Sequence, residues 1–454
     1  MNILSIYASH DGCVTYVQDG KIKFHTQIDR YNRFKHSAFP NRSLFNLINS
    51  LKVDKLIISH GKDHAMGVWK SVLDYSDNLK KTLNEDGLIY YGDKYHHMFH
   101  AYCVSTWNKD VQDILVADGG GTTVNGQVEN ESHYKNGDSK FIKLETNQIG
   151  KDYENFTREH FGNWFHCGKT MAWSLYDRRP RELQKDFEGR MLNLIDKWEL
   201  KNFLYTGGCA QNVIFNSWLF REKQIFCDPF NGDFGLSLGA VNYYLNNTIY
   251  NDRIYLGVTQ PINTDLFLNE KIKKVSPEEV CNILVNEPVA IFQSKSEQGQ
   301  RGLGNRSLLM DPLNKNANEK LNTIKKREWF RPFACSVLEE DSDDWFHMFM
   351  HKSPHMMYVF KLRQDKYNIL QSGIADDNTS RIQTVSRSDN PNYYNLLSAF
   401  KKKTGVPIIV NTSLNLPGEV LVETLQDLYM LFKESNLNYI YFPEIETMVE
   451  KKWK

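Results

Sequence analysis

The sequence predicts a chain of mixed α/β and α+β class, in which a duplicated N-terminal domain precedes a second domain. Its 454 residues exceed what a single hydrophobic core usually serves. A pattern of apolar strand, Asp-Gly turn and hairpin occurs twice, first at the start of the chain and again from near residue 113. Loosely patterned sequence at 251–274 then separates two regions of regular pattern. We therefore expect domains at 1–250 and 275–454, joined by a linker.

The first of the two repeated units opens the chain. The run ILSIYASHDG is typical of a buried strand that ends in a polar turn, and CVTYVQDGKIKFHTQI predicts a hairpin around Asp19 and Gly20. The second unit, DILVADGGGTTVNG, runs from an apolar strand into Asp118 and three glycines. Because helical sequence separates the units, we expect two related halves that hold a nucleotide between them, as in the actin-like (ASKHA) ATPases.

Two later segments place glycines at the end of apolar runs. KNFLYTGGCAQN predicts a strand, a turn at Gly207 and Gly208, and a helix start, and such glycines let backbone N–H groups approach a ligand closely. In CDPFNGDFGLSLGAVNYY we expect Asp233 to cap a helix of small residues. The second domain opens at VSPEEVCNIL, with Ser276 as the helix cap and Pro277 at the first helical position.

A cluster of histidines stands out in YGDKYHHMFHAY. If this stretch is helical, His96 and His100 share one face, whereas His97 points roughly 100° away. Together with Asp118 and Asp233, the first pair would form a mixed nitrogen and oxygen ligand set suited to iron(II), manganese or zinc. The alternative is that both aspartates only form turns and caps. The residues alone leave both interpretations open.

Basic residues alternate with glycines and polar turns in the second domain. They occur in KSEQGQRGLGNRS, KKREWFRPFA and SRIQTV, and the strand VPIIVNTSLNLPGE ends in polar side chains. The residues concerned are Arg301, Lys325, Arg327, Arg331, Arg381, Asn411, Thr412 and Ser413. Because arginine binds phosphate with two parallel hydrogen bonds, we expect a pocket for a polyphosphate or an acyl phosphate. An RNA-facing surface for the cations and turn formation for the polar residues are the alternatives.

The segment NTIKKREWFRPFA should leave a helix and become extended. Pro332 disfavours helical backbone at Arg331, so we expect Lys325 to reach the pocket from the helix and Arg331 from the chain after it. The aromatic residues expected to anchor this bend in the core are Trp329, Phe330 and Phe333.

Composition excludes several broad classes of protein. Lysine plus arginine equals aspartate plus glutamate, at 55 each, so net charge favours neither nucleic acid nor a membrane surface as partner. No apolar stretch approaches the roughly 18 residues of a membrane span, and MNILSIYASHDG is typical of a strand rather than a signal peptide. Seven single cysteines without a CxxC pair indicate a reducing compartment. We therefore expect a cytoplasmic protein that does not contact membranes.

Eight motifs in a fixed order resemble one known family. They are HDG at 10–12, HHMFHA at 96–101, DGGG at 118–121, GGCAQN at 207–212, DFGLSLGA at 233–240, GQRGLGNRS at 299–307, REWFRPFA at 327–334 and NTSLN at 411–415. Together they resemble the O-carbamoyltransferases of the nodulation, cephamycin and tobramycin type, over nearly the whole chain. The resemblance implies an actin-like domain similar to the tRNA threonylcarbamoyl transferase TsaD, followed by a YrdC-like domain.

The resemblance also implies a reaction. The YrdC-like domain would make carbamoyl adenylate from carbamoyl phosphate and ATP, with magnesium accompanying the ATP. The actin-like domain would then pass the carbamoyl group to a hydroxyl of a small-molecule or nucleotide acceptor, using an iron(II) site. A sugar or aminocyclitol hydroxyl and a hydroxymethylated nucleotide are both compatible acceptors.

Residues carried over from the family fall into four groups. The implied metal ligands are His96, His100, Asp118 and Asp233, which leaves His97 off the metal. The implied catalytic residues are His10 and Asp11, with Asp11 as the candidate base. The implied nucleotide-binding residues are Gly119, Gly120, Gly207, Gly208 and Asn212. The residues implied to hold carbamoyl phosphate and ATP are Arg301, Lys325, Arg331, Arg381, Asn411 and Ser413.

The chain departs from the family pattern at a few positions, and other functions remain open. Ala375 stands where the family commonly has a histidine, Lys295 replaces an arginine, and Gln300 and Gly302 flank Arg301 in place of proline and alanine. One alternative function is a tRNA-modifying enzyme of the threonylcarbamoyladenosine type, which the neutral net charge disfavours. Another is a non-catalytic regulator that binds nucleotide and metal.

Overall fold

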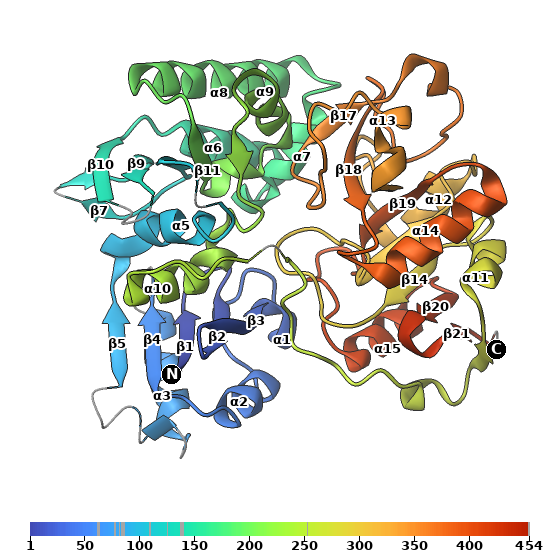
Figure 1. The fold of residues 1–454 in the computed structure, drawn as a ribbon, viewed down its shortest axis with the longest axis horizontal. Helices are drawn as coiled ribbons and strands as arrows, with labels where there is room; N and C mark the ends of the chain where they lie inside the picture. The colour runs from blue at the N-terminus through green and yellow to red at the C-terminus, as the bar shows by residue number, and fades with distance from the viewer. Residues whose placement is uncertain are drawn as a thin grey trace. The chain divides into compact units, whose positions relative to one another are not determined.

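The computed structural model describes residues 1–452 except 61–63, 77, 78, 81, 83–86, 109, 125, 137–139 and 252. The chain divides into two compact units, Met1–Asp252 and Arg253–Lys454. Each unit combines helices with one or more sheets, so the predicted mixed α/β class is confirmed (Figure 1).

Unit 1 contains two five-stranded sheets with the same topology. Their strand orders are β3-β2-β1-β4-β5 and β10-β9-β6-β11-β12, and in both sheets three antiparallel strands are followed by two parallel ones. The duplicated strand pattern that the sequence predicts is therefore present. The strands are β1 (Asn2–Tyr7), β2 (Cys13–Gln18), β3 (Lys21–Gln27), β4 (Lys55–Ser59), β5 (Leu88–Tyr91), β6 (Asp113–Ala117), β9 (Glu131–Lys135), β10 (Lys140–Glu145), β11 (Phe203–Thr206) and β12 (Phe226–Cys227), with β7 (Thr123–Val124) and β8 (Gln127–Val128) as a separate pair.

The turn between β2 and β3 shows why the local sequence folds this way. Asp19 and Gly20 both have positive φ, 51° and 73°, as a tight two-residue hairpin requires. The predicted hairpin is therefore confirmed, and its polar turn leaves the apolar residues of β1 and β2 buried.

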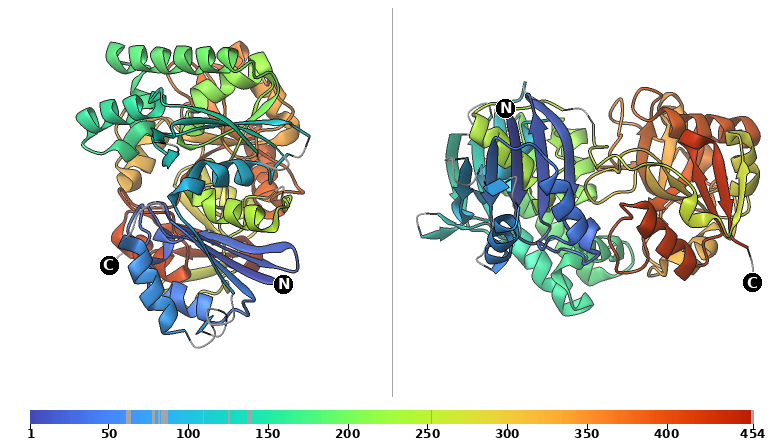
Figure 2. Two further views of the ribbon diagram at one scale, coloured as in Figure 1. Left: turned by 90° about the vertical axis from the view of Figure 1, so that its left-hand side faces the viewer. Right: turned by 90° about the horizontal axis from the view of Figure 1, so that it is seen from below.

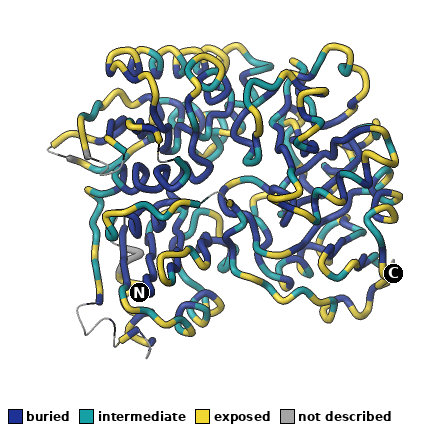
Figure 3. The backbone as a smooth tube through the Cα atoms, in the orientation of Figure 1, coloured by how far each residue is buried: buried dark blue, intermediate teal, exposed yellow. Residues whose placement is uncertain are grey.

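Two helices lie between the sheets of unit 1 and pack against each other. Helix α10 (Leu236–Leu245) contacts β1 and β2 of the first sheet, whereas α5 (His96–Val104) contacts β6 and β11 of the second (Figure 1). Gly239 permits this close packing, because a Cβ atom there would lie 1.9 Å from the Phe99 carbonyl oxygen. Helix α5 is buried along nearly its whole length (Figure 3).

The remaining helices of unit 1 cover the outer faces. Helices α2 and α3 lie on the side of the first sheet away from α10, and α6 to α9 surround the second sheet (Figure 2). The helices are α1 (Asp29–Asn32), α2 (Arg42–Asn49), α3 (His64–Asp74), α5 (His96–Val104), α6 (Ile149–Phe161), α7 (Cys167–Trp173), α8 (Arg178–Lys197), α9 (Val213–Lys223) and α10 (Leu236–Leu245), with short 3-10 turns η1 (Asp93–Tyr95), η2 (Trp164–His166), η3 (Gly208–Gln211) and η4 (Asp233–Gly235).

Unit 2 is built on one mixed nine-stranded sheet in the order β13-β21-β20-β14-β15-β19-β16-β18-β17. Its strands are β13 (Lys271–Lys274), β14 (Val289–Phe292), β15 (Arg306–Met310), β16 (Ala334–Leu338), β17 (Val359–Lys361), β18 (Thr379–Val385), β19 (Ile408–Ser413), β20 (Tyr439–Phe442) and β21 (Thr447–Glu450). Its helices are α11 (Pro277–Leu284), α12 (Ala317–Lys325), α13 (Ser342–Trp345), α14 (Pro391–Thr404) and α15 (Leu425–Glu434), with short 3-10 turns η5 (Asp265–Phe267), η6 (Glu339–Asp341), η7 (Gln364–Lys366) and η8 (Pro443–Ile445).

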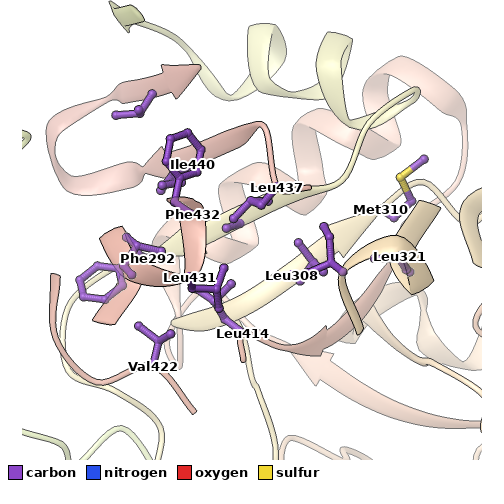
Figure 4. Close-up of a cluster of buried hydrophobic side chains, with 14 of the residues drawn as sticks. Phe292, Leu308, Met310, Leu321, Leu414, Val422, Leu431, Phe432, Leu437 and Ile440 are labelled. Atoms are coloured by element: carbon purple, nitrogen blue, oxygen red, sulfur yellow. The ribbon is translucent and has the colours of Figure 1, made fainter. Parts of the chain in front are cut away.

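Apolar side chains bury both faces of this sheet. One cluster joins strand residues such as Phe292 and Leu308 to α12 and α15 (Figure 4), and a second joins the opposite face to α11 and α14. The predicted helix start at Ser276 is confirmed, because its side chain accepts a hydrogen bond from the Glu279 N–H while the Glu279 side chain accepts one from the Ser276 N–H.

The segment expected to be a linker, 251–274, belongs mostly to unit 2. It includes η5 and the edge strand β13, which pairs with β21. Phe267 is fully buried in the core that contains Phe292, and Glu270 accepts hydrogen bonds from Lys433 and from the backbone of Lys452. Its polar, loosely patterned sequence hid this role, because an edge strand needs few apolar residues.

Candidate metal and phosphate sites

Four side chains from three parts of unit 1 converge on one point. His96 and His100 lie on α5, Asp118 follows β6, and Asp233 opens η4 just before α10. The Nε2 atom of His100 is 3.2 Å from Asp118 Oδ2 and 3.5 Å from Asp233 Oδ1, and the Nε2 atom of His96 is 3.6 Å from Asp233 Oδ1. One ligand atom from each residue lies within 4.8 Å of the others, a spacing that a single ion can bridge.

The chemistry of these donors fits a cation. The Nε2 atoms of both histidines are buried and make no hydrogen bond to any residue that the structure describes. Burial alone would raise the pKa of Asp118, but the adjacent imidazoles of His100 and His96 hold it well below its usual range. Burial would lower the pKa of His100, yet Asp118 and Asp233 raise it to about 9. Positive charge is therefore favoured at this point, and a divalent ion would supply it in place of protonated imidazoles.

Tyr7, at the end of β1, links two of the four residues and was missed from the sequence. Its hydroxyl donates to Asp233 Oδ2 at 3.1 Å and lies 3.3 Å from His96 Nδ1. Because the hydroxyl hydrogen is given to Asp233, His96 Nδ1 must carry the hydrogen of the second contact, which leaves Nε2 free for an ion. The only sequence signal for Tyr7 is its place near the end of a buried strand.

His97 contacts a different part of unit 1. Its Nδ1 atom lies 2.8 Å from the Ser132 hydroxyl, and that hydroxyl donates to Glu129. The structure thus separates His97 from His96 and His100, as the helical spacing predicts. Asp233 departs from expectation, because no side chain caps α10 and Gly235 occupies the cap position. The carboxylate that was expected to cap the helix faces the histidines instead.

Glycine turns follow the neighbouring strands β6 and β11, beside Asp118. The N–H groups of Gly119 and Gly208 donate to Asp118 at 2.6 and 3.2 Å. Gly207 has φ of 90°, and a Cβ atom there would lie 2.2 Å from the Ala117 carbonyl oxygen. Around Gly120, by contrast, no described atom would come within 4 Å of a Cβ. These turns therefore hold the Asp118 carboxylate in place, and they leave open space beside Gly120.

The Asn212 side chain caps helix α9. It accepts from the Phe215 N–H at the start of α9 and pairs with Gln184, and it is buried. The Asn212 amide, which the resemblance implied to bind nucleotide, is therefore already hydrogen-bonded within unit 1.

His10 and Asp11 lie beside the four-residue cluster. His10 Nε2 is 3.5 Å from Asp233 Oδ2, and Asp11 contacts His10 Nδ1 at 3.4 Å and His36 Nδ1 at 2.7 Å. Burial would raise the pKa of Asp11, but its hydrogen bonds to His10 and His36 lower it to about 2. His36, which stacks on Phe165 at 3.5 Å, was missed from the sequence because it lies 25 residues from Asp11.

Four arginines of unit 2 gather closely enough to shift one another's pKa. Burial and then Arg331 lower the pKa of Arg301 to about 10, and burial, Arg331 and Arg301 lower that of Arg327 to about 9. Burial and the other three arginines lower the pKa of Arg381 well below its usual range. All four side chains nevertheless remain partly exposed, so a dissolved anion can reach the group. Arg327, which also donates to Thr412 at 2.8 Å, was not in the set implied by resemblance.

The remaining implied phosphate residues lie on or beside β19. Lys325 Nζ donates to the Ser413 carbonyl at 2.7 Å and to Asn415, and a Cβ atom on Gly302 would lie 2.8 Å from Ser413 Cα. The loop that carries Arg301 and the turn after β19 are therefore neighbours. Asn411 is buried and donates to Ser336 and Gln383, so its amide ties strands together.

The aromatic residues after α12 were expected to anchor the bend in the core, and this prediction is correct for two of the three. Phe330 and Phe333 are 8% and 4% exposed, as predicted for core anchors. Trp329 is 76% exposed, so its predicted place in the core is wrong. The chain turns within two residues there, and only one of two adjacent large rings can face inward.

Comparison with known proteins finds similarity to carbamoyltransferases. A family model described as Carbamoyltransferase C-terminus matches residues 281–451. The nodulation protein NolNO of Sinorhizobium fredii is 34% identical over 53% of the chain, and the 3'-hydroxymethylcephem-O-carbamoyltransferase of Amycolatopsis lactamdurans is 32% identical over 51%. Residues 281–451 therefore match the C-terminal domain of carbamoyltransferases, and about half of the chain is similar to each of these two relatives.

The chain spans less than half the length of those two relatives, since the matches cover 38% and 45% of them. It also matches an uncharacterised protein of Methanocaldococcus jannaschii at 26% identity, over 96% of this chain and 97% of that one. Among solved structures, a ROK hexokinase from Thermus thermophilus is similar with a TM-score of 0.32 and 10% identity, over 54% of this chain and 99% of that chain. Within the described residues, the chain has no helix with the length and apolar character needed to cross a membrane.

Proposed function

We propose that this protein is a carbamoyltransferase that uses ATP to activate a carbamoyl group and then transfers that group to an acceptor hydroxyl. The observation that carries the proposal is the arginine group of unit 2. Among the described interactions, Glu328 is the one carboxylate that pairs with it, against four guanidinium groups. Such an excess of like charge is offset when a multiply charged anion binds. Carbamoyl phosphate and ATP are anions of this kind.

In the first step, unit 2 would act as a YrdC-like domain. Carbamoyl phosphate, ATP and one water molecule would give carbamoyl adenylate, phosphate and pyrophosphate, with magnesium accompanying the nucleotide. Arg301, Arg331 and Arg381 would bind phosphate oxygens through paired hydrogen bonds. Lys325 would hold the turn at Ser413 in place, as its contacts there suggest.

In the second step, unit 1 would pass the carbamoyl group to the acceptor. Its four-residue cluster of two histidines and two aspartates fits iron(II), which when bound would polarise the carbamoyl carbonyl. The backbone at Gly120, which has open space beside it, would approach the adenylate phosphate. Asp11, held by His36, would keep His10 oriented beside the cluster.

The first test follows the products. Full-length protein supplied with ATP and carbamoyl phosphate should release pyrophosphate only when both are present. Mass spectrometry should then detect one added carbamoyl group on members of a panel of hydroxylated small molecules and nucleotides. Absence of carbamoyl phosphate-dependent pyrophosphate release would support a non-catalytic regulator instead. Modification confined to tRNA would support the threonylcarbamoyladenosine alternative.

The second test separates the two steps with variants. Arg301→Ala should lose at least tenfold in pyrophosphate release, because it removes a charged contact to phosphate, yet should still transfer from supplied carbamoyl adenylate. Asp11→Asn should show the reverse pattern, since the amide cannot accept hydrogen bonds from both His10 and His36 in the same way. Equal losses of both activities in both variants would contradict the division of labour between the units.

A further inference from the structure

A carboxylate outside every motif lies against the loop that follows Asp118. A Cβ atom on Gly119 would lie 1.9 Å from Oε1 of Glu154. The carboxylate can therefore occupy this position only because residue 119 has no side chain. One turn earlier on the same helix, a Cβ atom on Gly150 would lie 2.9 Å from the Asp118 carbonyl group. Residues four apart share one face of a helix, so this face of α6 packs on the Asp118 loop.

Glu154 has one carboxylate oxygen available. Its Oε2 atom accepts from Lys151 at 3.2 Å, whereas Oε1 has no hydrogen bond among the described interactions. The Glu154 side chain is 15% exposed and Lys151 is 47% exposed, so solvent weakens this ion pair. Glu154 therefore combines a recessed position with an oxygen that can accept a further hydrogen bond.

The groups around Glu154 come from several elements. Lys151 lies on the same helix, Asp118 on the loop after β6, His10 on the loop after β1, and the thiols of Cys167 and Cys209 on α7 and η3. Burial and then the charge of Asp118 raise the pKa of Glu154 to about 7, while Lys151 and His10 lower it. Glu154 thus lies against the loop of Asp118, and its free Oε1 atom is placed to accept a proton there.

Asp11, the base implied by resemblance, is less suited to accept a proton. Both of its carboxylate oxygens are already hydrogen-bonded, one to His10 and the other to His36. Those bonds stabilise the ionised form, so taking up a proton would break them. The geometry suits Asp11 to orienting His10, and it leaves the role of base to another group.

We propose that Glu154 accepts the proton of the acceptor hydroxyl during carbamoyl transfer, an inference that rests on the proposed function. The acceptor oxygen bonds to the carbamoyl carbon as its proton passes to Oε1 of Glu154. The bond between that carbon and the phosphate oxygen breaks, and AMP leaves with the bonding electrons. Atoms and charge balance without any further reactant.

The experiment uses the full chain with its bound metal, supplied with carbamoyl adenylate and one of two simple alcohols. Ethanol holds its proton tightly, whereas trifluoroethanol is far more acidic and depends less on a base. Glu154→Gln should slow carbamoyl transfer to ethanol by roughly 10²- to 10⁴-fold, and transfer to trifluoroethanol by much less. Glu154→Asp should recover part of the ethanol activity. Metal content should equal that of the unaltered protein.

The matched control is Glu159→Gln, the same change at an exposed position of the same helix, which should leave both rates unchanged. Equal losses with the two alcohols in Glu154→Gln, or no loss with either, would overturn the assignment. If the unaltered protein transfers to neither alcohol, the proposed function fails and the assignment of Glu154 fails with it. Transfer by the unaltered protein with no effect of Glu154→Gln would instead overturn the assignment alone.

Discussion

At the scale of single residues, the four-residue cluster of unit 1 depends on the side chains that touch it. Tyr7 contacts both Asp233 and His96, and so determines which nitrogen of that imidazole faces the cluster. Partners of this kind usually contribute strongly to metal affinity, because they orient the ligands before the ion arrives.

Removing the Tyr7 hydroxyl tests this role. Tyr7→Phe keeps the ring but removes both contacts, so we expect iron(II) affinity to fall by about 10- to 100-fold, measured by titration of metal-free protein. His97→Ala should leave the metal stoichiometry unchanged, since His97 bonds to Ser132 outside the cluster. His100→Ala should lower the stoichiometry. Unchanged affinity in Tyr7→Phe would show that the hydroxyl does not orient the ligands.

The arginines of unit 2 pose the opposite problem, because they repel one another until an anion binds. Arg381 has a buried Nε atom without a hydrogen-bond partner, and its neighbours Arg301, Arg327 and Arg331 depress its pKa. Residues of this kind serve binding at the expense of stability.

Arg381→Gln should therefore separate binding from stability. We expect the free energy of unfolding of the ligand-free protein to stay the same or rise by up to ~1 kcal/mol. Pyrophosphate affinity should fall roughly 10- to 100-fold, so the thermal shift produced by pyrophosphate should largely disappear. Arg363→Gln, which changes an arginine paired with Asp343 on the surface, should retain that shift. A strongly destabilised Arg381→Gln protein would contradict the argument.

At the scale of elements, the packing of α5 on α10 places three of the four cluster residues. His96 and His100 lie on α5, and Asp233 enters just before α10. The two helices approach through Gly239 and the backbone at Phe99. Their separation therefore sets the distances within the cluster.

Gly239→Ala should push the two helices apart. A new methyl group cannot fit 1.9 Å from a carbonyl oxygen, so we expect unfolding free energy to fall by about 1–3 kcal/mol and metal affinity to fall with it. Gly189→Ala is the matched control, since it lies exposed on α8 with nothing within 4 Å of the added Cβ. That change should stabilise the protein by about 0.5–1 kcal/mol in chemical denaturation. Equal changes in unfolding free energy in the two variants would mean that α5 and α10 are not closely packed at Gly239.

At the scale of the whole molecule, formal charge is balanced, with 55 basic and 55 acidic residues. Mild acid therefore does not destabilise the fold mainly through repulsion between like charges. Buried groups that take up protons on unfolding have the larger effect on stability. His25 is fully buried beside Thr15, and burial lowers its pKa from 6.5 to about 4. The unfolded chain binds that proton more readily than the folded chain.

Stability should consequently fall as the pH drops from 6.5 towards 4. His25 alone accounts for about 3 kcal/mol over this window, since the unfolded state is protonated first. Above pH 6.5 both states are neutral at this residue, and its effect vanishes. In urea unfolding across this range, His25→Asn should show a shallower loss of stability than the unaltered chain. An identical pH slope would exclude His25 as a cause.

Local features of the fold were predictable because they depend on residues a few positions apart. The turn at Asp19 and Gly20, the helix start at Ser276 and the separation of His97 from His96 and His100 all follow from such short-range rules. The repeated strand pattern also appears in the sequence, because each copy carries its own Asp-Gly turn. The sequence by itself thus determined the mixed α/β class, the duplication and the helical face that carries two histidines.

Contacts between distant residues were decided by the tertiary structure. Tyr7 meets Asp233 across 226 residues and Glu154 meets Gly119 across 35, and no local pattern encodes either contact. Packing also overruled two local expectations: Asp233 faces the histidines rather than capping α10, and Trp329 is exposed. The physical reason is that a polar side chain bonds to whichever partner packing brings within about 3 Å, and that partner is known only when the whole chain has folded.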